Sequence, residues 1–332
     1  VGDGPCASGF SDVHLLHHCL SGICRNEVDL TCLLPGLPAL AHPIIINAIT
    51  GGADAVAKIN ESLAIVARET GSAMAVGSQF GTVRTGLHRD SYTIVRKCNP
   101  KGLIFANLSA FASVEQAKAA IDMISADALQ IHLNPAQELA MEEGDRDFSN
   151  CLSHIEAMVQ GVGVPVIVKE TGCGMAKKEA QDLLDVGVTL LDIGGAGGTN
   201  FPAIEHQRYP EGNEELSEWG IPTVLSLLSV VQTVGWGNGV IASGGIRSAL
   251  DVVKAQVLGA SAVAMAGNLL QKIQQEGTEE TIHFLQRLLN KVLDFYTLLG
   301  CRTFRDLHEA RYYLTGETAQ AVSWLRKYDQ ND

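Results

Sequence analysis

A run of polar side chains follows the pattern of a strand near the middle of the chain. The segment reads Gln130-Ile131-His132-Leu133-Asn134, and Gln137 and Glu138 come shortly after it. Successive side chains of a strand point to opposite faces, so Gln130, His132 and Asn134 share one face. Amide, imidazole and carboxylate groups that converge at the end of one strand are more typical of a functional site than of a core. We therefore expect catalysis or ligand binding here.

A lysine ends another apolar run. Lys169 follows Val166-Ile167-Val168, so its stem lies among apolar side chains, where a charge needs an anionic or electron-rich partner. Its neighbour Glu170 points to the opposite face of a strand and is a poor partner. We therefore expect the Lys169 ammonium to face a ligand.

Glycine-rich turns follow four further apolar runs. They read Thr50-Gly51-Gly52, Gly194 to Thr199, Ser243-Gly244-Gly245 and Ala266-Gly267. Such turns expose backbone N–H groups and let a ligand approach the chain closely. In β/α barrels, the loops after strands seven and eight and a helix N-terminus commonly bind a phosphate. The last two turns therefore predict a phosphate site, whereas Ser78 and Asn107, at two other run ends, are by themselves ordinary helix caps.

Eight apolar runs alternate with amphipathic stretches. This alternation is typical of a parallel sheet covered by helices, and eight units predict a closed TIM (β/α)8 barrel, an α/β fold. An open doubly wound sheet would carry GxGxxG after its first strand, and no such motif is present there. We expect strands at 43–49, 73–79, 102–108, 128–133, 165–171, 190–195, 239–245 and 262–267, and helices near 55–69, 90–97, 113–124, 150–161, 176–186, 222–234, 248–258 and 278–298.

Three segments lie outside the eight units of what we expect to be a single domain, 1–332. Residues 1–42 form an N-terminal extension at the bottom or edge of the barrel. Residues 200–221, an insertion after strand six, are long enough for a lid. Residues 300–332 are expected to be a helical tail.

The composition excludes several classes of function. The chain of 332 residues has a formal net charge of −13, which disfavours a nucleic-acid partner because phosphate binding needs a basic surface. Its apolar runs fall short of the roughly 20 residues of a membrane span. Eight cysteines without a CxxC pair indicate reduced thiols, and Val1–Gly9 does not read as a secretory signal. We therefore expect a cytoplasmic protein with a small-molecule substrate, no nucleic acid and no membrane.

The motifs together resemble one family, the type 2, FMN-dependent isopentenyl diphosphate isomerases. The similarity spans about residues 10 to 315. The strand that ends at Asn134 carries its most specific part. The matching segments are Ile46 to Gly52, Ala75 to Gln79, Ala106 to Leu108, Gln130 to Asn134 with Gln137 and Glu138, Val168 to Glu170, Asp192 to Phe201, Trp219 to Thr223, Ser243 to Gly245 and Met265 to Gly267.

The resemblance implies an enzyme that interconverts isopentenyl and dimethylallyl diphosphate by proton addition and removal, with reduced FMN and Mg²⁺. NADPH would reduce the flavin, and the protein would be a homo-oligomer, a tetramer or octamer. His132 and Gln137 would be catalytic and Glu138 would bind the metal. Substrate would contact Ser78, Gln79, Phe80, His132, Asn134, Gln137 and Trp219. FMN would contact Ala48, Ile49, Thr50, Ser78, Asn107, Lys169, Gly194, Thr199, Gly244, Gly245, Ala266 and Gly267.

The chemistry of these residue types agrees with the implied roles. One carboxylate, Glu138, is enough for Mg²⁺ when a diphosphate supplies further oxygens. Lys169 beside the flavin would stabilise negative charge on the reduced ring. His132 and Gln137 would orient and polarise the substrate.

Two positions differ from the family pattern, and two other functions stay open. The Arg-Lys pair and His with which the family clasps the diphosphate have no counterpart near Val1, which predicts weaker diphosphate binding. Ile49 stands where Met is usual, a change of similar volume. The alternatives are an FMN-dependent 2-hydroxyacid oxidoreductase, although the strand ends offer few arginines for a carboxylate, and a catalytically silent flavin-binding scaffold.

Overall fold

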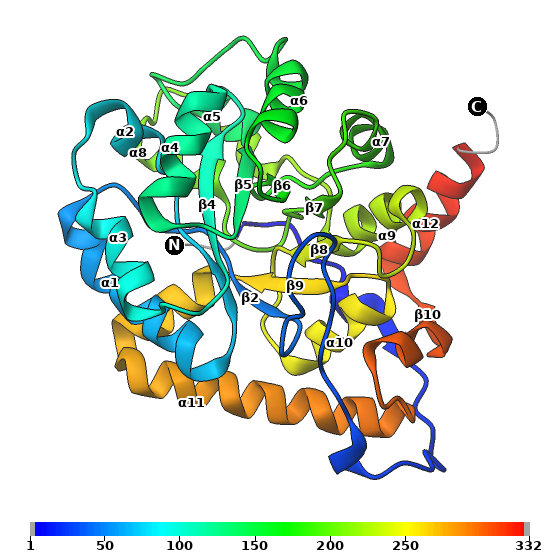
Figure 1. Cartoon of the computed structure of the whole chain (residues 1–332). Coiled ribbons are helices and arrows are strands. Elements are labelled where there is room, and N and C mark those ends of the chain that lie inside the picture. Colours follow the sequence, from blue (N-terminus) through cyan, green and yellow to red (C-terminus); the bar gives the residue numbers. More distant parts are fainter. Residues whose placement is uncertain (1–3, 329–332) are drawn as a thin grey trace.

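Eight parallel strands close into a barrel in the computed structural model, which describes residues 4–328 (Figure 1). The strands follow one another around the barrel in sequence order, and the last pairs with the first. All eight expected strands are present, so the predicted barrel is confirmed. Their bounds are β2 (Ile44–Ile46), β3 (Ala73–Ala75), β4 (Ile104–Ser109), β5 (Ala128–Leu133), β6 (Val166–Glu170), β7 (Leu190–Asp192), β8 (Val240–Ser243) and β9 (Ala262–Met265).

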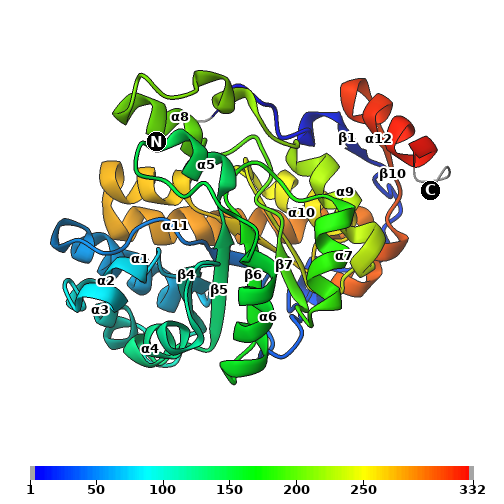
Figure 2. The same ribbon diagram turned by 90° about the horizontal axis from the view of Figure 1, so that it is seen from above.

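Helices cover the outside of the barrel (Figures 1 and 2). Local signals in the sequence start several of them: the side chain of Ser113 caps one helix and that of Ser248 another, each by accepting a backbone N–H of the first turn. Every expected helix is present. The helices are α1 (Asp54–Thr70), α2 (Phe80–Thr85), α3 (Asp90–Cys98), α4 (Val114–Ile124), α5 (Pro135–Ala140), α6 (Cys151–Gly161), α7 (Lys177–Asp185), α8 (Phe201–Arg208), α9 (Thr223–Val234), α10 (Ala249–Val257), α11 (Gly267–Leu299) and α12 (Gly316–Tyr328).

The part of the barrel interior nearer the N-terminal ends of the strands is an apolar layer. Because alternate strand residues point inward, each strand contributes one or two side chains to it. The layer is fully buried and small residues predominate on β3 and β9, which lets the larger side chains of the other strands fill the axis. Its strand members are Ile45, Ala73, Ala75, Phe105, Ala128, Ile167, Leu190, Ile241, Ala262 and Ala264.

The N-terminal segment closes the lower end of this layer. Cys32 and Leu40 pair as an antiparallel bridge, and both pack with Leu34 against the apolar interior residues of the barrel. Burial of these three side chains excludes water from the end of the barrel opposite to the loops that follow the strands.

The sequence predicted a helical tail at 300–332, but the described part of this segment is only partly helical. It begins with a 3-10 helix, Phe304–Glu309, and a short strand, β10 (Tyr312–Leu314), before α12. That strand pairs antiparallel with β1 (Val13–Leu15), so both ends of the chain meet in a two-stranded sheet beside the barrel. Non-local strand pairing of this kind leaves no periodic signal in three residues.

The insertion at 200–221 is folded rather than an irregular loop. It contains α8 and a 3-10 helix, Glu214–Glu218. The side chain of Asn200 holds the two together, because its oxygen caps α8 at Ala203 N (2.9 Å) and its nitrogen donates to Ser217 O (2.6 Å). Figure 2 shows α8 beside α5, over the end of the barrel where the strands finish.

Helix α11 is two helices joined at Gly277, whose backbone angles, φ 85° and ψ 180°, are not helical. The sequence predicted only the second part, near 278–298. The first part begins at Gly267, directly after β9, so its N-terminus opens at the same end of the barrel as the loops after β7 and β8. Over the part of the chain that the structure covers, no helix combines the length and apolarity that a membrane crossing requires.

Candidate active site

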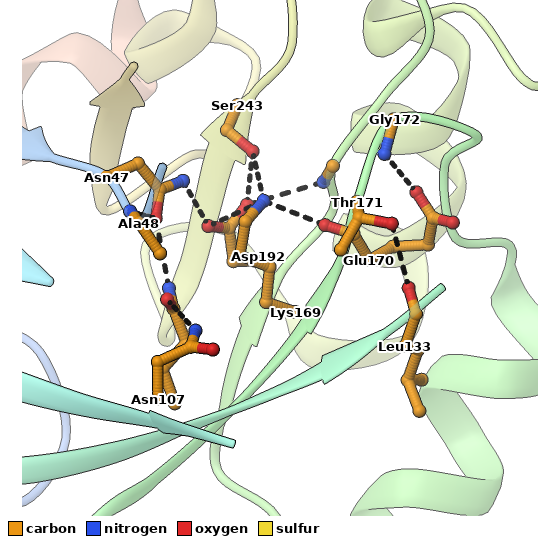
Figure 3. A network of polar contacts seen from close by, with 12 residues as sticks. Asn47, Ala48, Asn107, Leu133, Lys169, Glu170, Thr171, Gly172, Asp192 and Ser243 are labelled. Carbon is orange, nitrogen blue, oxygen red and sulfur yellow. Dashed lines mark hydrogen bonds and ion pairs between the residues drawn. The ribbon is translucent and has the colours of Figure 1, made fainter. Parts of the chain in front are cut away.

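A layer of polar side chains follows the apolar layer along the strands of the barrel, and Figure 3 shows part of its network of contacts. On six strands the inward residue two positions after the apolar one is polar, in keeping with the alternation of strand side chains. All are almost completely buried. The members of this polar layer are Asn47, Asn107, Gln130, Lys169, Asp192 and Ser243.

Lys169 finds its anionic partner within this layer, on the neighbouring strand. Its Nζ lies 3.4 Å from Oδ2 of Asp192, 3.4 Å from Oγ of Ser243 and 2.7 Å from its neighbour's main-chain oxygen, Glu170 O. The Asp192 carboxylate is completely buried and also accepts hydrogen bonds from the Ser243 hydroxyl and the Gly194 N–H. A buried charge of this kind is stable only because it is paired and hydrogen-bonded.

A chain of amides connects this ion pair to His132. Asn47 donates its Nδ2–H to Asp192 Oδ2 (2.8 Å) and accepts from Gln130 Nε2 at its Oδ1 (3.0 Å). Asn107 in turn donates its Nδ2–H to Gln130 Oε1 (2.8 Å), and its Oδ1 lies 2.9 Å from His132 Nδ1. The expected shared face of Gln130 and His132 is therefore present, and it points into the barrel.

The surroundings of His132 and Glu170 disfavour their charged forms. Burial, and then the nearby charge of Lys169, lower the pKa of His132 to about 4. Burial raises the pKa of Glu170 to about 7, against three backbone N–H donors of the loop 172–174 that hold its Oε2. His132 is therefore neutral near pH 7.

A cavity of about 420 Å³ opens above the polar layer. Asn47, Lys169 and Ser243 form part of its wall, so its inner end lies against the ion pair. Most of the rest of the wall comes from the loops after β2, β6, β7, β8 and β9 and from the first part of α11, with Phe201 of α8 and Phe284 of the second part of α11. This is the position at which barrel enzymes place their ligands.

The outer end of the cavity is built from backbone. Gly244 has φ 104°, and a Cβ there would lie 1.9 Å from Gly195 O; Gly245 has φ 70°, and its Cβ would lie 2.3 Å from Gly197 O. Only glycine fits both places. The N-terminus of α11 at Gly267 lies in the same wall, and its first residue has no side-chain cap. Unpaired N–H groups and the helix dipole make such an end suitable for a phosphate.

A second polar cluster lies where α5 meets α8. Asn134 Nδ2 donates to Glu138 Oε1 (2.9 Å) and lies 3.3 Å from Gln137 Oε1. Gln137 Nε2 donates to Oε1 of Glu205 (2.9 Å), a buried carboxylate on α8 whose other oxygen pairs with Arg208 (2.6 Å). Over residues 4–328, no three or more His, Cys, Asp or Glu side chains are grouped so that they alone could hold a metal ion.

The structure brings most of the sequence-predicted cofactor residues to one place. Those that line the cavity are Ala48, Ile49, Lys169, Gly194, Thr199, Gly244, Gly245, Ala266 and Gly267. The predicted substrate and metal residues Asn134, Gln137 and Glu138 lie together in the second cluster, and His132 lies in contact with the polar layer.

Several predicted residues are placed elsewhere. The Thr50 hydroxyl donates to Asn60 Oδ1 (2.6 Å), outside the cavity wall. Gln79 is completely buried, because its amide nitrogen donates to Ala120 O of α4 (3.0 Å) and its oxygen accepts from Asn107 N (3.0 Å). Its amide contacts helix α4 and the β4 backbone and lies outside the cavity wall, so its role as a substrate contact stays a prediction.

The described cavity wall also lacks Ser78, Phe80, Asn107 and Trp219. The Ser78 carbonyl accepts a hydrogen bond from the Tyr92 hydroxyl, and the Phe80 ring lies 5.4 Å from the Arg84 guanidinium. Trp219 follows the 3-10 helix of the insertion and is 69% exposed. Asn107 lies deeper, within the polar layer.

The sequence did not single out four residues of the two polar groups: Asn47, Asp192, Ser243 and Glu205. The first three could have been found from strand alternation, since each lies two positions after an inward apolar residue of its strand. Glu205 carried no such signal, because only the folding of the insertion onto α5 brings it to Gln137.

Comparison with known proteins adds to this geometry. Residues 88–314 match the family of FMN-dependent dehydrogenases. The chain is 45% identical over 313 residues to an isopentenyl-diphosphate delta-isomerase of Geobacillus sp., covering 94% of this chain and 89% of that protein. Identities are 44% over 97% of this chain and 88% of the protein of the same name from Symbiobacterium thermophilum, and 40% over 98% of this chain and 92% of that from Staphylococcus aureus.

Solved structures share the fold at much lower identity. A mandelate oxidase variant with (S)-mandelic acid superimposes with a TM-score of 0.69 at 17% identity, over 95% of this chain and 92% of that one. Another, with a monooxide FMN adduct, gives a TM-score of 0.68 at 17% identity over 95% of this chain and 94% of that chain. The match over nearly the whole length with its sequence relatives makes the chain a member of the isopentenyl-diphosphate delta-isomerase family.

Proposed function

We propose that this protein interconverts isopentenyl diphosphate and dimethylallyl diphosphate, with reduced FMN and Mg²⁺. The observation that carries the proposal is the cavity: a paired lysine lies at its inner end, and glycines whose backbone would suit a phosphate lie at its outer end. Relatives at 40% identity and above bear the name of this activity.

The residues of the cavity fit FMN. Asn47, Lys169 and Ser243 offer polar groups to a flat ring system at the inner end, and the glycines after β8 leave room for no side chain where a phosphate would bind. The N-terminus of α11 adds N–H donors there. FMN would supply acid–base chemistry to the allylic carbons when it is bound and reduced. Lys169 would favour the anionic form of the ring through its positive charge.

The second cluster fits a metal ion whose coordination would be completed by the oxygens of a diphosphate. Glu138 is the one carboxylate there that no cation neutralises in the described contacts, since its oxygens accept only from Asn134 and the Asp145 N–H. Mg²⁺ is commonly bound by one or two carboxylates together with phosphate oxygens and water. Glu138 would thus hold the metal that fixes the diphosphate.

Gln137 and Glu205 are placed to orient the substrate for proton addition and removal, because the Gln137 amide carries no titratable proton and Glu205 is held by Gln137 and Arg208. Moving a double bond by one carbon requires a proton to be added at one end of the unit and removed at the other. The buried Glu205 carboxylate orients the Gln137 amide through their 2.9 Å hydrogen bond. His132, neutral near pH 7, would orient the substrate without adding a charge.

The insertion would exclude water from this reaction. Helix α8 packs on α5 and its Glu205 accepts a hydrogen bond from Gln137 of α5, so displacement of the insertion would open the cluster. Trp219, exposed here, would join the substrate if the insertion moves further over the barrel end. A cationic intermediate needs such protection.

The proposed enzyme also needs a reductant for its flavin, a reducing compartment and a defined oligomeric state. NADPH would reduce the flavin, as the resemblance implies. The eight cysteines, all unpaired, suit the reducing cytoplasm. A tetramer or octamer is what the resemblance implies, and exposed apolar side chains such as Trp324 (71% exposed) and Leu325 (45%) would suit contact between subunits. The substrate is a small diphosphate; the net charge of −13 disfavours nucleic acid.

Product analysis with two substrates tests the proposal. The FMN-loaded, reduced protein should convert isopentenyl diphosphate and leave a 2-hydroxy acid such as mandelate unchanged. Lys169→Met should lose turnover because it removes the cation at the inner end of the cavity. The exposed Lys178→Met on α7 is the matched control and should keep it. Oxidation of the hydroxy acid would favour the oxidoreductase, and failure with both substrates would favour a silent scaffold.

A further inference from the structure

The hydrogen-bond chain that crosses the barrel has one direction. It runs from the Asp192 carboxylate through Asn47, Gln130 and Asn107 to His132. An ionised carboxylate only accepts hydrogen bonds, whereas each amide has one donating and one accepting end. The orientation of the first amide therefore decides that of each following one.

Asn47 is oriented from two sides. Its Nδ2–H donates to Asp192 Oδ2 at 2.8 Å, and its Oδ1 accepts from the backbone N–H of Ala48 at 2.9 Å. A backbone N–H can only donate, so the two contacts agree on which end is oxygen and exclude the flipped amide (Figure 3).

The orientations of Gln130 and Asn107 follow in turn from that of Asn47. Because Asn47 presents oxygen to Gln130, Gln130 must present its NH₂ group there (3.0 Å) and its oxygen to Asn107. Asn107 must then present its NH₂ group to Gln130 (2.8 Å) and its oxygen to His132 Nδ1 (2.9 Å). An amide oxygen only accepts hydrogen bonds and would repel the lone pair of an unprotonated ring nitrogen, so His132 Nδ1 must carry a hydrogen and donate it to Asn107 Oδ1.

We propose that Asp192, Asn47, Gln130 and Asn107 are positioning residues that fix His132 as the tautomer with hydrogen on Nδ1 and a free lone pair on Nε2. Burial and the charge of Lys169 separately lower the pKa of His132 to about 4, so the ring holds a single proton near pH 7. Over the described chain, no hydrogen bond to Nε2 is formed. Its lone pair is thus available to accept a hydrogen bond.

The consequence for catalysis, which rests on the proposed function, is that His132 accepts at Nε2 and does not donate there. A substrate or cofactor group that meets Nε2 must bring its own hydrogen. Asp192 thereby acts at two places: directly on Lys169 through the ion pair, and on the tautomer of His132 through three amides.

The ring-nitrogen chemical shifts of His132 test the inference directly. They are recorded near pH 7 by NMR on the protein as purified, with isotope-labelled histidine, and His132→Asn identifies the signal by its loss. We expect a protonated Nδ1 and an unprotonated Nε2. A hydrogen on Nε2, or on both nitrogens, would overturn the proposal. No turnover is measured, so failure of the proposed function leaves this result interpretable.

A variant that interrupts the hydrogen-bond chain tests whether that chain fixes the tautomer of His132. Gln130→Met has a similar volume and removes both hydrogen bonds, so Asn107 is free to turn and the Nδ1-bound hydrogen should be lost in favour of Nε2. Gln256→Met is the control. It removes a buried glutamine that accepts a hydrogen bond from Tyr296 and bonds to no member of the hydrogen-bond chain, so it should keep the wild-type protonation of His132. Retention of that protonation in Gln130→Met would contradict the proposed cause, and should that variant not fold, the wild-type spectrum still decides the tautomer.

Discussion

Asp192 faces Lys169 across two neighbouring strands inside the barrel, with Oδ2 and Nζ 3.4 Å apart and the carboxylate completely buried. The pair explains how a lysine can remain among apolar strand residues. It also provides the inner end of the cavity with a charge of fixed position, which neither residue could hold alone.

Removal of the anion should therefore be costly. Asp192→Asn leaves the Lys169 ammonium buried without its counter-charge, and we expect the free energy of unfolding to fall by about 3 kcal/mol. Denaturant unfolding of the FMN-free protein measures this. The control, Asp182→Asn, breaks the exposed Lys178–Asp182 pair (2.6 Å) and should leave stability unchanged. Equal stability of the two variants would contradict the structural role of the buried pair.

His132 should make the protein sensitive to acid. Its pKa is about 4 when folded and 6.5 in the unfolded chain, so the unfolded state binds the extra proton as the pH falls from 6.5 to 4. The stability is fully present above pH 6.5 and decreases by about 3 kcal/mol through this window. His132→Asn should lose this contribution.

The measurement is the free energy of unfolding at both ends of that window, compared between variants. The control is His17→Asn, an exposed histidine without a hydrogen bond in the described contacts, and it should keep the wild-type acid dependence. If His132→Asn is as acid-sensitive as the wild type, His132 is charged in the folded protein.

The glycines after β8 should be essential to FMN binding. In Gly244→Ala the new methyl group would lie 1.9 Å from Gly195 O, so the loop must move and FMN content should be lost. Gly163→Ala is matched in backbone conformation, with φ 74°, but meets no atom within 4 Å. It should cost about 1 kcal/mol of stability and keep its flavin. Full flavin content in Gly244→Ala would exclude this loop as the phosphate site.

Glu138 should determine the magnesium requirement. Glu138→Gln replaces a carboxylate by a weak ligand for a hard cation, so half-maximal activity should need at least tenfold more Mg²⁺ while FMN stays bound. Titration of turnover against Mg²⁺ measures this, with Glu142→Gln on the exposed surface as control. Unchanged magnesium dependence would show that Glu138 is not the ligand.

The barrel could be predicted because its signal is local and repeated. Each strand is a short apolar run followed by a glycine turn or a cap, and the glycine turns after β8 and β9, predicted to bind a phosphate, line the cavity. The pairing of β1 with β10 and the docking of α8 on α5 were not predictable, since both join segments through tertiary contacts that leave no period in the sequence.

The residues of the candidate site likewise fall into those with a local signal in the sequence and those that only tertiary contacts bring into place. His132 and Lys169 stood out because polar groups interrupted apolar strands. The direction of the Gln79 side chain could not be predicted, because the residue lies beyond the end of β3, and in the structure it contacts α4. Glu205 depended on the fold of the insertion and was therefore missed.

The central claim is a redox-neutral isomerisation with reduced FMN, and the amount of reductant consumed tests it most directly. The FMN-loaded protein is reduced anaerobically with a known amount of NADPH and given excess isopentenyl diphosphate. We predict many equivalents of dimethylallyl diphosphate per flavin, with no NADPH consumed after the initial reduction and no product from the oxidised protein. Turnover with oxidised FMN, or one NADPH consumed for each product, would contradict the account.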